Sequence, residues 1–228
     1  MPLINDRIRF RAAAATALAM SLLGGRAALA QPSVDRGPEI ALRTGIALPF
    51  GQVEGGNNTD LDRYASSAIP IVIEAGYRLD PALFFGVRFQ YAFPQLKNPN
   101  GNCDNVSCDG SGVQLGIEGI YRFLPASRFA PWAGLAAGYE WWTADYFTTN
   151  LGAGATVSGF QASLQAGGDV RVTPQLVVGP FIDVSFGRFD SSTDRVRIGN
   201  TTNTTERDIA DTAMHTWVTI GVRGAFGL

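Results

Sequence analysis

The sequence predicts an all-β fold, an eight-stranded antiparallel up-and-down transmembrane β-barrel after an N-terminal signal peptide. Three observations support this prediction. Apolar and polar residues alternate in eight segments, which is the period of a strand with one apolar face. The connections between these segments are alternately short and long. Charged residues make up only 17% of the chain, below the roughly 25% typical of soluble domains.

The N-terminus has the three parts of a secretory signal peptide. Arg7, Arg9 and Arg11 form a basic region, an apolar stretch follows, and Ala28-Leu29-Ala30 is a cleavage site of the A-x-A type. A core helix is the alternative, but charge, length and cleavage site together favour export. We expect the following organisation: residues 1–30 as signal peptide, 31–38 as a short periplasmic lead and 39–228 as the barrel domain.

The charge of the exported chain argues against nucleic acid as a partner. Removal of residues 1–30 takes away four arginines and one aspartate, which leaves 14 basic against 19 acidic residues and a net charge of −5. Nucleic-acid binding needs a basic surface. No run of 18 apolar residues follows the N-terminus, so we expect no membrane-spanning helix.

Each predicted strand is long enough to cross a bilayer at a tilt, which takes about 9–11 residues. The eight strands are expected at 39–50, 69–79, 82–93, 113–124, 131–143, 160–173, 176–189 and 215–228. Asp80-Pro81, 125–130 and Pro174-Gln175 are the short turns, expected in the periplasm. The long polar connections, 51–68, 94–112, 144–159 and 190–214, are expected to be four extracellular loops.

The apolar face of these strands carries aromatic residues at two levels. Tyr77, Tyr121 and Phe123 lie near the short turns, whereas Tyr91 and Trp141 lie near the long loops. Two aromatic girdles are typical of a membrane-spanning barrel.

The opposite face carries small residues and balanced charge, which predicts an interior charge network. The twelve charged residues on this face are Glu39, Arg43, Glu74, Arg78, Arg88, Glu118, Arg122, Glu140, Asp169, Arg171, Asp183 and Arg223. Glu74 and Arg88 flank the turn at Asp80-Pro81 at nearly equal distances, and one of the two likely registers puts them directly opposite. Glu118 is expected as a further partner of Arg88. Eight strands leave a lumen that side chains can fill.

A soluble periplasmic lipocalin-like barrel is the alternative, with the apolar face inside and a ligand bound there. Three features favour the membrane barrel. Lys97 is the only lysine, the polar face is rich in glycine, and the aromatic residues form two levels instead of filling a centre.

Cys103 and Cys108 lie in a polar, Gly- and Asn-rich stretch. An exported protein meets an oxidising compartment, so we expect a disulfide between them. We expect no metal site, because the single histidine, His215, is over 100 residues away. We also expect no cofactor site and no catalytic residues, since phosphate-binding and EF-hand motifs are lacking and His215 is interpreted as a packed or rim residue.

With strands, turns and girdles assigned, residues 39–228 resemble small outer-membrane β-barrel proteins of the OmpA/OmpX-like superfamily. The resemblance rests on pattern and on the C-terminal strand, V-T-I-G-V-R-G-A-F-G-L, although the chain ends in Leu228 where an aromatic residue is usual. It implies a cell outer-membrane location in a Gram-negative-type envelope and a monomer. The implied partners are outer-membrane lipid, lipopolysaccharide, the barrel-insertion machinery and an unknown surface ligand.

Three functions are compatible with this sequence. The first is a structural or surface-binding role through the long loops, without catalysis. The second is a small porin-like pore or transport of hydrophobic molecules. The third is the soluble ligand-binding barrel considered above.

Overall fold

The computed structural model describes residues 36–228, apart from 58, 98–102, 104–106, 149–150 and 200. The predicted signal peptide lies outside the described residues, as does most of the predicted lead. The first strand begins at Gly37, two residues before its predicted start. No helix of the described part is long and apolar enough to cross a membrane.

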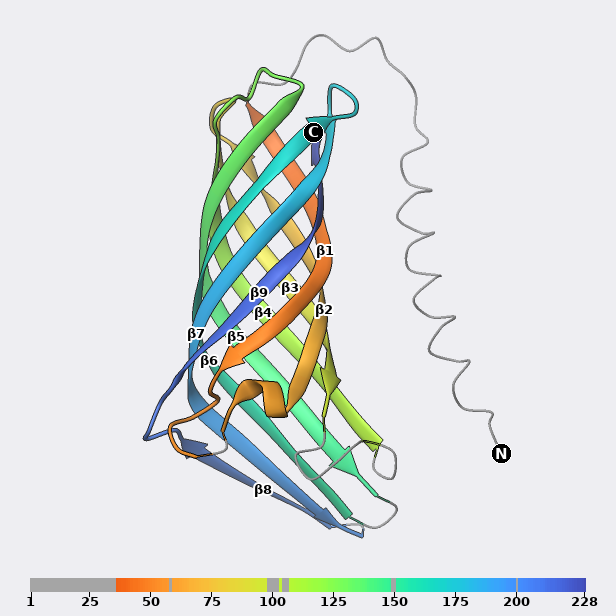
Figure 1. Ribbon diagram of the computed structural model, residues 1–228, viewed down its shortest axis with the longest axis vertical. Coiled ribbons are helices and arrows are strands. Elements are labelled where there is room, and N and C mark those ends of the chain that lie inside the picture. The colour runs from red at the N-terminus through yellow and green to blue at the C-terminus, as the bar shows by residue number, and fades with distance from the viewer. Residues whose placement is uncertain (1–35, 58, 98–102, 104–106, 149–150, 200) are drawn as a thin grey trace, which may run out of the picture. The chain divides into compact units, whose positions relative to one another are not determined.

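Eight strands close into an antiparallel barrel, as the sequence predicts. They are β1 (Gly37–Gly51), β2 (Ala65–Arg78), β3 (Leu83–Leu96), β4 (Ser107–Arg122), β5 (Phe129–Phe147), β6 (Leu151–Arg171), β7 (Leu176–Ile198) and β9 (Met214–Gly227). Each strand pairs with its neighbour in the chain, β1 pairs with β9, and β9 pairs with β7. The pairing of β6 with β7 completes the closed barrel (Figure 1).

The predicted loops 144–159 and 190–214 are wrong in part, because most of their residues form strands. β5 and β6 continue to Phe147 and Leu151, and β7 continues to Ile198. A ninth strand, β8 (Thr201–Asp208), folds back on the end of β7. Beyond the membrane a strand has no lipid-facing side, so these segments lack the apolar alternation that marked the barrel strands. The hairpin of β7 and β8 projects at the loop end of the barrel, which is drawn at the bottom of Figure 1. We use "upper" and "above" for positions toward this loop end, and "lower" and "below" for positions toward the short turns.

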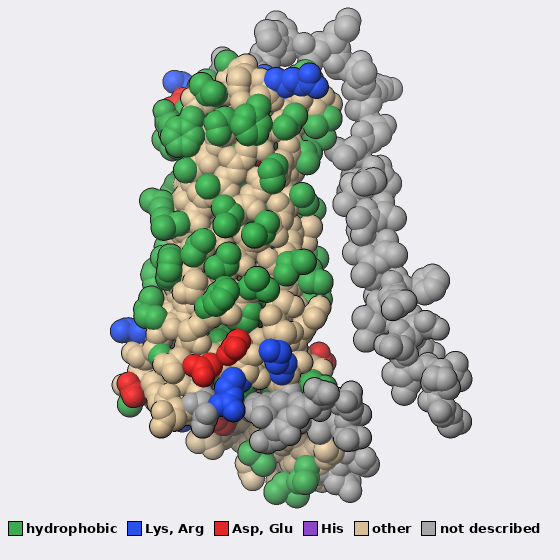
Figure 2. Space-filling view, viewed as in Figure 1, with side chains coloured by type: hydrophobic (Ala, Val, Ile, Leu, Met, Phe, Trp, Pro, Cys, Tyr) green, Lys and Arg blue, Asp and Glu red, His purple; other side chains and the backbone are tan. Residues whose placement is uncertain are grey.

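The apolar face of the strands lies on the outside of the barrel. Ile46, Leu135 and Ile220 are 59%, 63% and 61% exposed. Figure 2 shows hydrophobic side chains over the barrel wall and charged ones gathered near its two ends. A closed barrel with an apolar exterior is suited to lipid. The lipocalin-like alternative is therefore wrong, because it needs this face inside.

Aromatic residues mark both ends of this apolar surface. Tyr121 packs edge-on against Phe123 near the short turns. Near the loops, Tyr91 packs against Phe93, and Tyr139 against Trp141. These pairs lie where the two predicted girdles are expected.

Candidate functional site

The alternation that turns apolar residues outward turns charged residues into the lumen. Ten of the twelve predicted charges are buried: Glu39, Arg43, Glu74, Arg88, Glu118, Arg122, Glu140, Asp169, Asp183 and Arg223. Arg78 and Arg171 are half-buried at the short-turn end. Arg171 donates to the carbonyl oxygen of Pro125 (2.8 Å) in a turn and has no ion pair with the other predicted residues among the contacts found.

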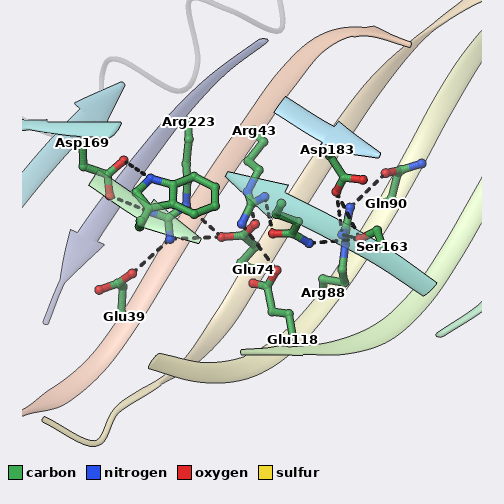
Figure 3. A network of polar contacts seen from close by, with 12 residues as sticks. Glu39, Arg43, Glu74, Arg88, Gln90, Glu118, Ser163, Asp169, Asp183 and Arg223 are labelled. Carbon is green, nitrogen blue, oxygen red and sulfur yellow. Dashed lines mark hydrogen bonds and ion pairs between the residues drawn. The ribbon is translucent and has the colours of Figure 1, made fainter. Parts of the chain in front are cut away.

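Arg223 on β9 is the centre of the lower network. Its guanidinium lies 3.1 Å from Glu39, 3.2 Å from Glu74 and 3.0 Å from Asp169, which project from β1, β2 and β6 (Figure 3). One cation thus joins three strands across the lumen. Buried ion pairs of this kind are stable only when each charge keeps its partners.

Glu39 is held by further cations at the short-turn end. Arg122 approaches it to 2.6 Å, and Arg78 also forms an ion pair with it. Asp169 accepts a hydrogen bond from Trp132 Nε1 at 3.0 Å. The lower network therefore includes contacts with further arginines, through Glu39, and with an aromatic side chain, through Asp169.

Arg43 connects this network to the upper lumen. It forms ion pairs with Glu74 and Glu118, the latter at 3.4 Å, and donates to Gln165 Oε1 at 2.7 Å. Gln165 in turn donates to the Ser163 hydroxyl at 3.3 Å, which lies 3.3 Å from Arg88 Nη1. The polar contacts therefore continue from Glu39 at the short-turn end to Arg88 and Asp183 (Figure 3).

Arg88 differs from the prediction in its partner. Glu74 and Arg88 are directly opposite in the β2–β3 ladder, which is one of the two registers that the sequence allowed. The ion pair of Arg88, however, is with Asp183 on β7, at 3.1 Å, and Glu118 pairs with Arg43. In a narrow closed barrel a long arginine side chain crosses the lumen, so its partner need not come from a neighbouring strand.

An apolar cluster beside the network escaped the sequence analysis. Phe84, Ile120, Trp132 and Phe181 are at most 4% exposed and pack together inside the barrel. The Arg43 guanidinium lies 5.1 Å from the Trp132 ring centre and 5.3 Å from that of Phe181, within cation–π range. One signal for this cluster was present in the sequence. Phe84 stands between the outward-facing Leu83 and Phe85, and such an uninterrupted apolar run breaks the alternation of a strand and indicates an apolar residue in the lumen.

An aromatic platform closes the lumen toward the loops. We use this name for Trp142, Trp217, Phe189 and His215. The two tryptophan rings are stacked, with centres 4.6 Å apart, and His215 is stacked on Phe189 at 4.0 Å. Trp142 lies near the loop end of β5, His215 and Trp217 near the start of β9, and Phe189 on β7 directly after its last residue paired with β9.

Glu140 ties the two halves of the platform together. It accepts a hydrogen bond from Trp142 Nε1 at 2.9 Å and is 2.6 Å from His215 Nε2. A Cβ atom at Gly187 would collide with both His215 and Glu140, so the pair depends on this glycine. The sequence analysis placed Glu140 in a charge network with arginines, but the partners found for it are His215 and Trp142.

Cavities of different character lie on the two sides of the platform. Below it, a void of about 20 Å³ is lined by Arg88, Gln114, Gln161, Asp183 and other mostly polar side chains. Such a space holds about one water molecule. Trp142 and Trp217 line this void and also the larger cavity above, so the tryptophan pair separates the two.

The upper cavity has a volume of about 240 Å³ and mostly apolar walls. Its aliphatic lining includes Val53, Leu61, Leu96, Val157 and Ile209. These residues come from β3, β6, the β1–β2 connection with its 3-10 turn (Leu61–Arg63), and the segment after β8. The cavity is thus assembled by the regions that the sequence analysis expected to be loops.

Arg207 on β8 forms the polar rim of this cavity. It lies 3.0 Å from Glu54 and 3.2 Å from Asp194. The hydrogen bonds that Arg207 donates to Glu54 and to Asp194 raise the pKa of its guanidinium. The rim therefore consists of two carboxylates around one cation, with a net charge of −1.

The predicted disulfide is present between Cys103, in the connection of β3 and β4, and Cys108, the second residue of β4. Cys103 Sγ lies 3.7 Å from the carbonyl oxygen of Leu96, the last residue of β3. The disulfide thus belongs to the loop end of the barrel.

Neither a protein-family model nor a curated protein matches this chain. Among solved structures, a major outer membrane protein from Thermus thermophilus is similar, with a TM-score of 0.61, 12% identity, and coverage of 86% of this chain and 100% of that one. Neisserial surface protein A gives a TM-score of 0.49 at 14% identity, covering 85% and 98% of the two chains. Ail of Yersinia pestis gives 0.45 at 13%, covering 83% and 99%.

At these identities the likeness concerns the fold. The chain has the fold of a small outer-membrane β-barrel, as the resemblance in its sequence implied. Its apolar exterior and aromatic ends are those of a membrane-spanning barrel. Both agree with the predicted location in the outer membrane.

Proposed function

We propose that the protein is a structural or surface-binding outer-membrane protein that acts through the strands projecting beyond the barrel. In this proposal the barrel is an anchor with a filled lumen, and the extracellular side carries the binding surface. The partners of the barrel are outer-membrane lipid and lipopolysaccharide, and the barrel-insertion machinery during assembly. The protein acts as a monomer without a catalytic step.

The observation that carries this proposal is the length of β7. Its pairing with β9 ends at Arg188, whereas its pairing with β6 continues to Ile198. The additional stretch, 189–198, extends about 33 Å at about 3.3 Å per residue. That is about the thickness of the hydrocarbon core. The sheet of β5, β6, β7 and β8 therefore reaches well into the space outside the membrane.

The composition of this hairpin fits a surface in water. All eight residues of β8 are exposed, and they are threonine, asparagine and charged residues. Arg195 on β7 is linked to Asp145 on β5 at 3.5 Å and to the Thr156 hydroxyl on β6 at 2.9 Å. Rigid, polar elements on a scaffold are suited to binding other surfaces.

The histidine supports the absence of catalysis in this proposal. His215 is fully buried and bonded to Glu140, so it has a packing role at the platform.

Shortening the projecting hairpin tests the proposal. Replacing residues 195–204 by Asn-Gly keeps the pairing of Asp194 with Thr205 and closes it with a two-residue turn. Cells that carry the shortened protein should attach less to surfaces, and aggregate less with one another, than cells that carry the intact protein. The barrel should still fold, which heat-modifiable mobility on gels will show.

The matched control introduces the same dipeptide at the opposite end. Replacing Asp80-Pro81 by Asn-Gly alters a short turn between β2 and β3 and leaves the loop end unchanged. Attachment should be unaffected by this control. Unchanged attachment with the shortened hairpin would overturn the surface-binding role.

The runner-up function, a small pore or a transporter of hydrophobic molecules, is favoured by the apolar cavity alone. The lumen below the platform is filled by ion pairs and by the Phe84 cluster. Planar bilayer recording separates the two functions. Steady conductance of the intact protein at the nanosiemens scale would favour the pore, whereas the filled lumen predicts no such current.

A further inference from the structure

We infer that the cavity above the aromatic platform is a binding site for one small, neutral, aromatic molecule of one or two fused rings. This inference rests on the proposed function, because it assigns a ligand class to the same extracellular side. The argument has four parts: size, wall chemistry, access and the charge of the rim.

The size of the cavity sets the size of the molecule. Its volume is about 240 Å³. An apolar cavity of about 150 Å³ takes up benzene, and drug-sized molecules need pockets of about 300 Å³ or more. A molecule of one or two fused rings fills the space between these limits.

The walls favour an apolar, planar molecule. Aliphatic side chains surround the space, and Trp142, Trp217 and Phe189 bound it on the lumen side. These rings are held in place by stacking and by the bonds of Glu140 to Trp142 and His215. A cavity without occupant forgoes the packing contacts of its lining atoms, so an apolar molecule restores what the fold leaves unfilled.

The rim gives access from water and selects for charge. The side chains of Glu54, Asp194 and Arg207 are 33%, 44% and 46% exposed and also line the cavity. A molecule can therefore enter from the extracellular side. Arg207 is engaged by both carboxylates, and the net charge of −1 disfavours an anion.

The site ends at the platform and does not lead through the barrel. The tryptophan pair lies between this cavity and the polar void of about 20 Å³ below it. Ion pairs fill the lumen beyond that void, beginning with Arg88 and Asp183. The geometry therefore supports capture of a molecule at the surface.

Binding of 2-naphthol and 2-naphthoate to the protein in lipid nanodiscs tests the inference. Isothermal titration, with empty nanodiscs subtracted, should give saturable binding of about one 2-naphthol per barrel and weaker binding of the carboxylate. Equal or tighter binding of 2-naphthoate would overturn the predicted selectivity, and absence of saturable 2-naphthol binding would overturn the site.

A pair of matched variants locates the site. Ala155→Trp fills the cavity, because Ala155 lines it. Ala153→Trp makes the same change two residues away on β6, at an exposed position that does not line the cavity. The first should weaken 2-naphthol binding about tenfold or more, and the second should leave it unchanged. Equal affinities of the two variants would place the molecule elsewhere.

The rim is tested by a change of charge alone. Glu54→Gln combined with Asp194→Asn leaves Arg207 without its carboxylate partners and reverses the sign of the rim. At low ionic strength this variant should bind 2-naphthoate severalfold more tightly than the unmodified protein does. An unchanged preference would show that the rim does not select the ligand.

The outcomes separate this inference from the proposed function. The shortened hairpin retains Asp194 and Arg207, so it keeps the cavity. Loss of attachment in that variant, without 2-naphthol binding in any form of the protein, would overturn the ligand site and leave the surface-binding role. Binding of 2-naphthol, with unchanged attachment of cells that carry the shortened hairpin, would support the ligand site and overturn the surface-binding role.

Discussion

The two parts of the barrel interior, below and above the aromatic platform, are filled in opposite ways. Below it, five arginines and five carboxylates neutralise one another around a small apolar cluster. Above it, mostly apolar walls enclose about 240 Å³ of space, and charges occur only at the rim. The comparison shows that the part of the interior surrounded by the membrane is the more polar one, and the part beyond the membrane is the more apolar one. The lumen is filled with mutually paired side chains, whereas the loop end encloses a cavity.

The largest effect is expected from Arg223→Met. The substitution preserves the length of the side chain but leaves Glu39, Glu74 and Asp169 buried without their shared cation. Loss of one partner from a buried ion pair typically costs about 3–5 kcal/mol. Urea unfolding of the protein in micelles, followed by gel mobility, measures the change in the free energy of unfolding.

Arg195→Met is the control at the loop end. Its pair with Asp145 is partly exposed, with side-chain exposures of 36% and 27%, so the loss should be about 1 kcal/mol or less. Equal losses for Arg223 and Arg195 would remove the distinction between a stabilising lumen and a permissive loop end.

A smaller effect should identify the partner of Arg88. Arg88→Leu leaves Asp183 without its cation, and the second change Asp183→Leu should recover part of the lost stability. A double-mutant cycle is expected to give a coupling energy of about 1–3 kcal/mol for this pair.

The matched cycle uses Glu74, which lies opposite Arg88 in the β2–β3 ladder but forms its ion pairs with Arg43 and Arg223. Its coupling to Arg88 should be smaller than that of Asp183. Stronger coupling to Glu74 would show that neighbouring strands, not strands across the lumen, supply the partners.

The smallest global effect is expected from the disulfide at the loop end. Replacing Cys103 and Cys108 by serine opens a ring of six residues, for which the chain-entropy model gives about 2 kcal/mol. The effect should stay at the loop end, because Cys103 lies outside the barrel ladder and Cys108 pairs with Tyr146 near the loop end of β5. Limited proteolysis should be faster in the β3–β4 connection while the unfolding midpoint of the barrel is unchanged. A lowered midpoint would show that the loop end does support the barrel.

The eight barrel strands and the inward face were predictable because they depend on a local rule. A strand with lipid on one side and a packed lumen on the other alternates at every residue, as in Leu83, Phe85 and Val87 against Gly86 and Arg88. The same rule gave the buried charges and the short turns. It failed where no side of the strand faces lipid, and β8 and the ends of β5, β6 and β7 were therefore interpreted as loops.

The sequence by itself determined which charged residues face inward and that the barrel has a short-turn end and a long-loop end. Only the tertiary structure decided that Arg88 pairs with Asp183, that Glu140 holds His215, and that Trp142 stacks on Trp217. The physical reason is the closure of the sheet. Alternation fixes the face on which a side chain lies, but closure brings together residues from strands far apart in the chain. A partner across the lumen therefore leaves no pattern in the local sequence.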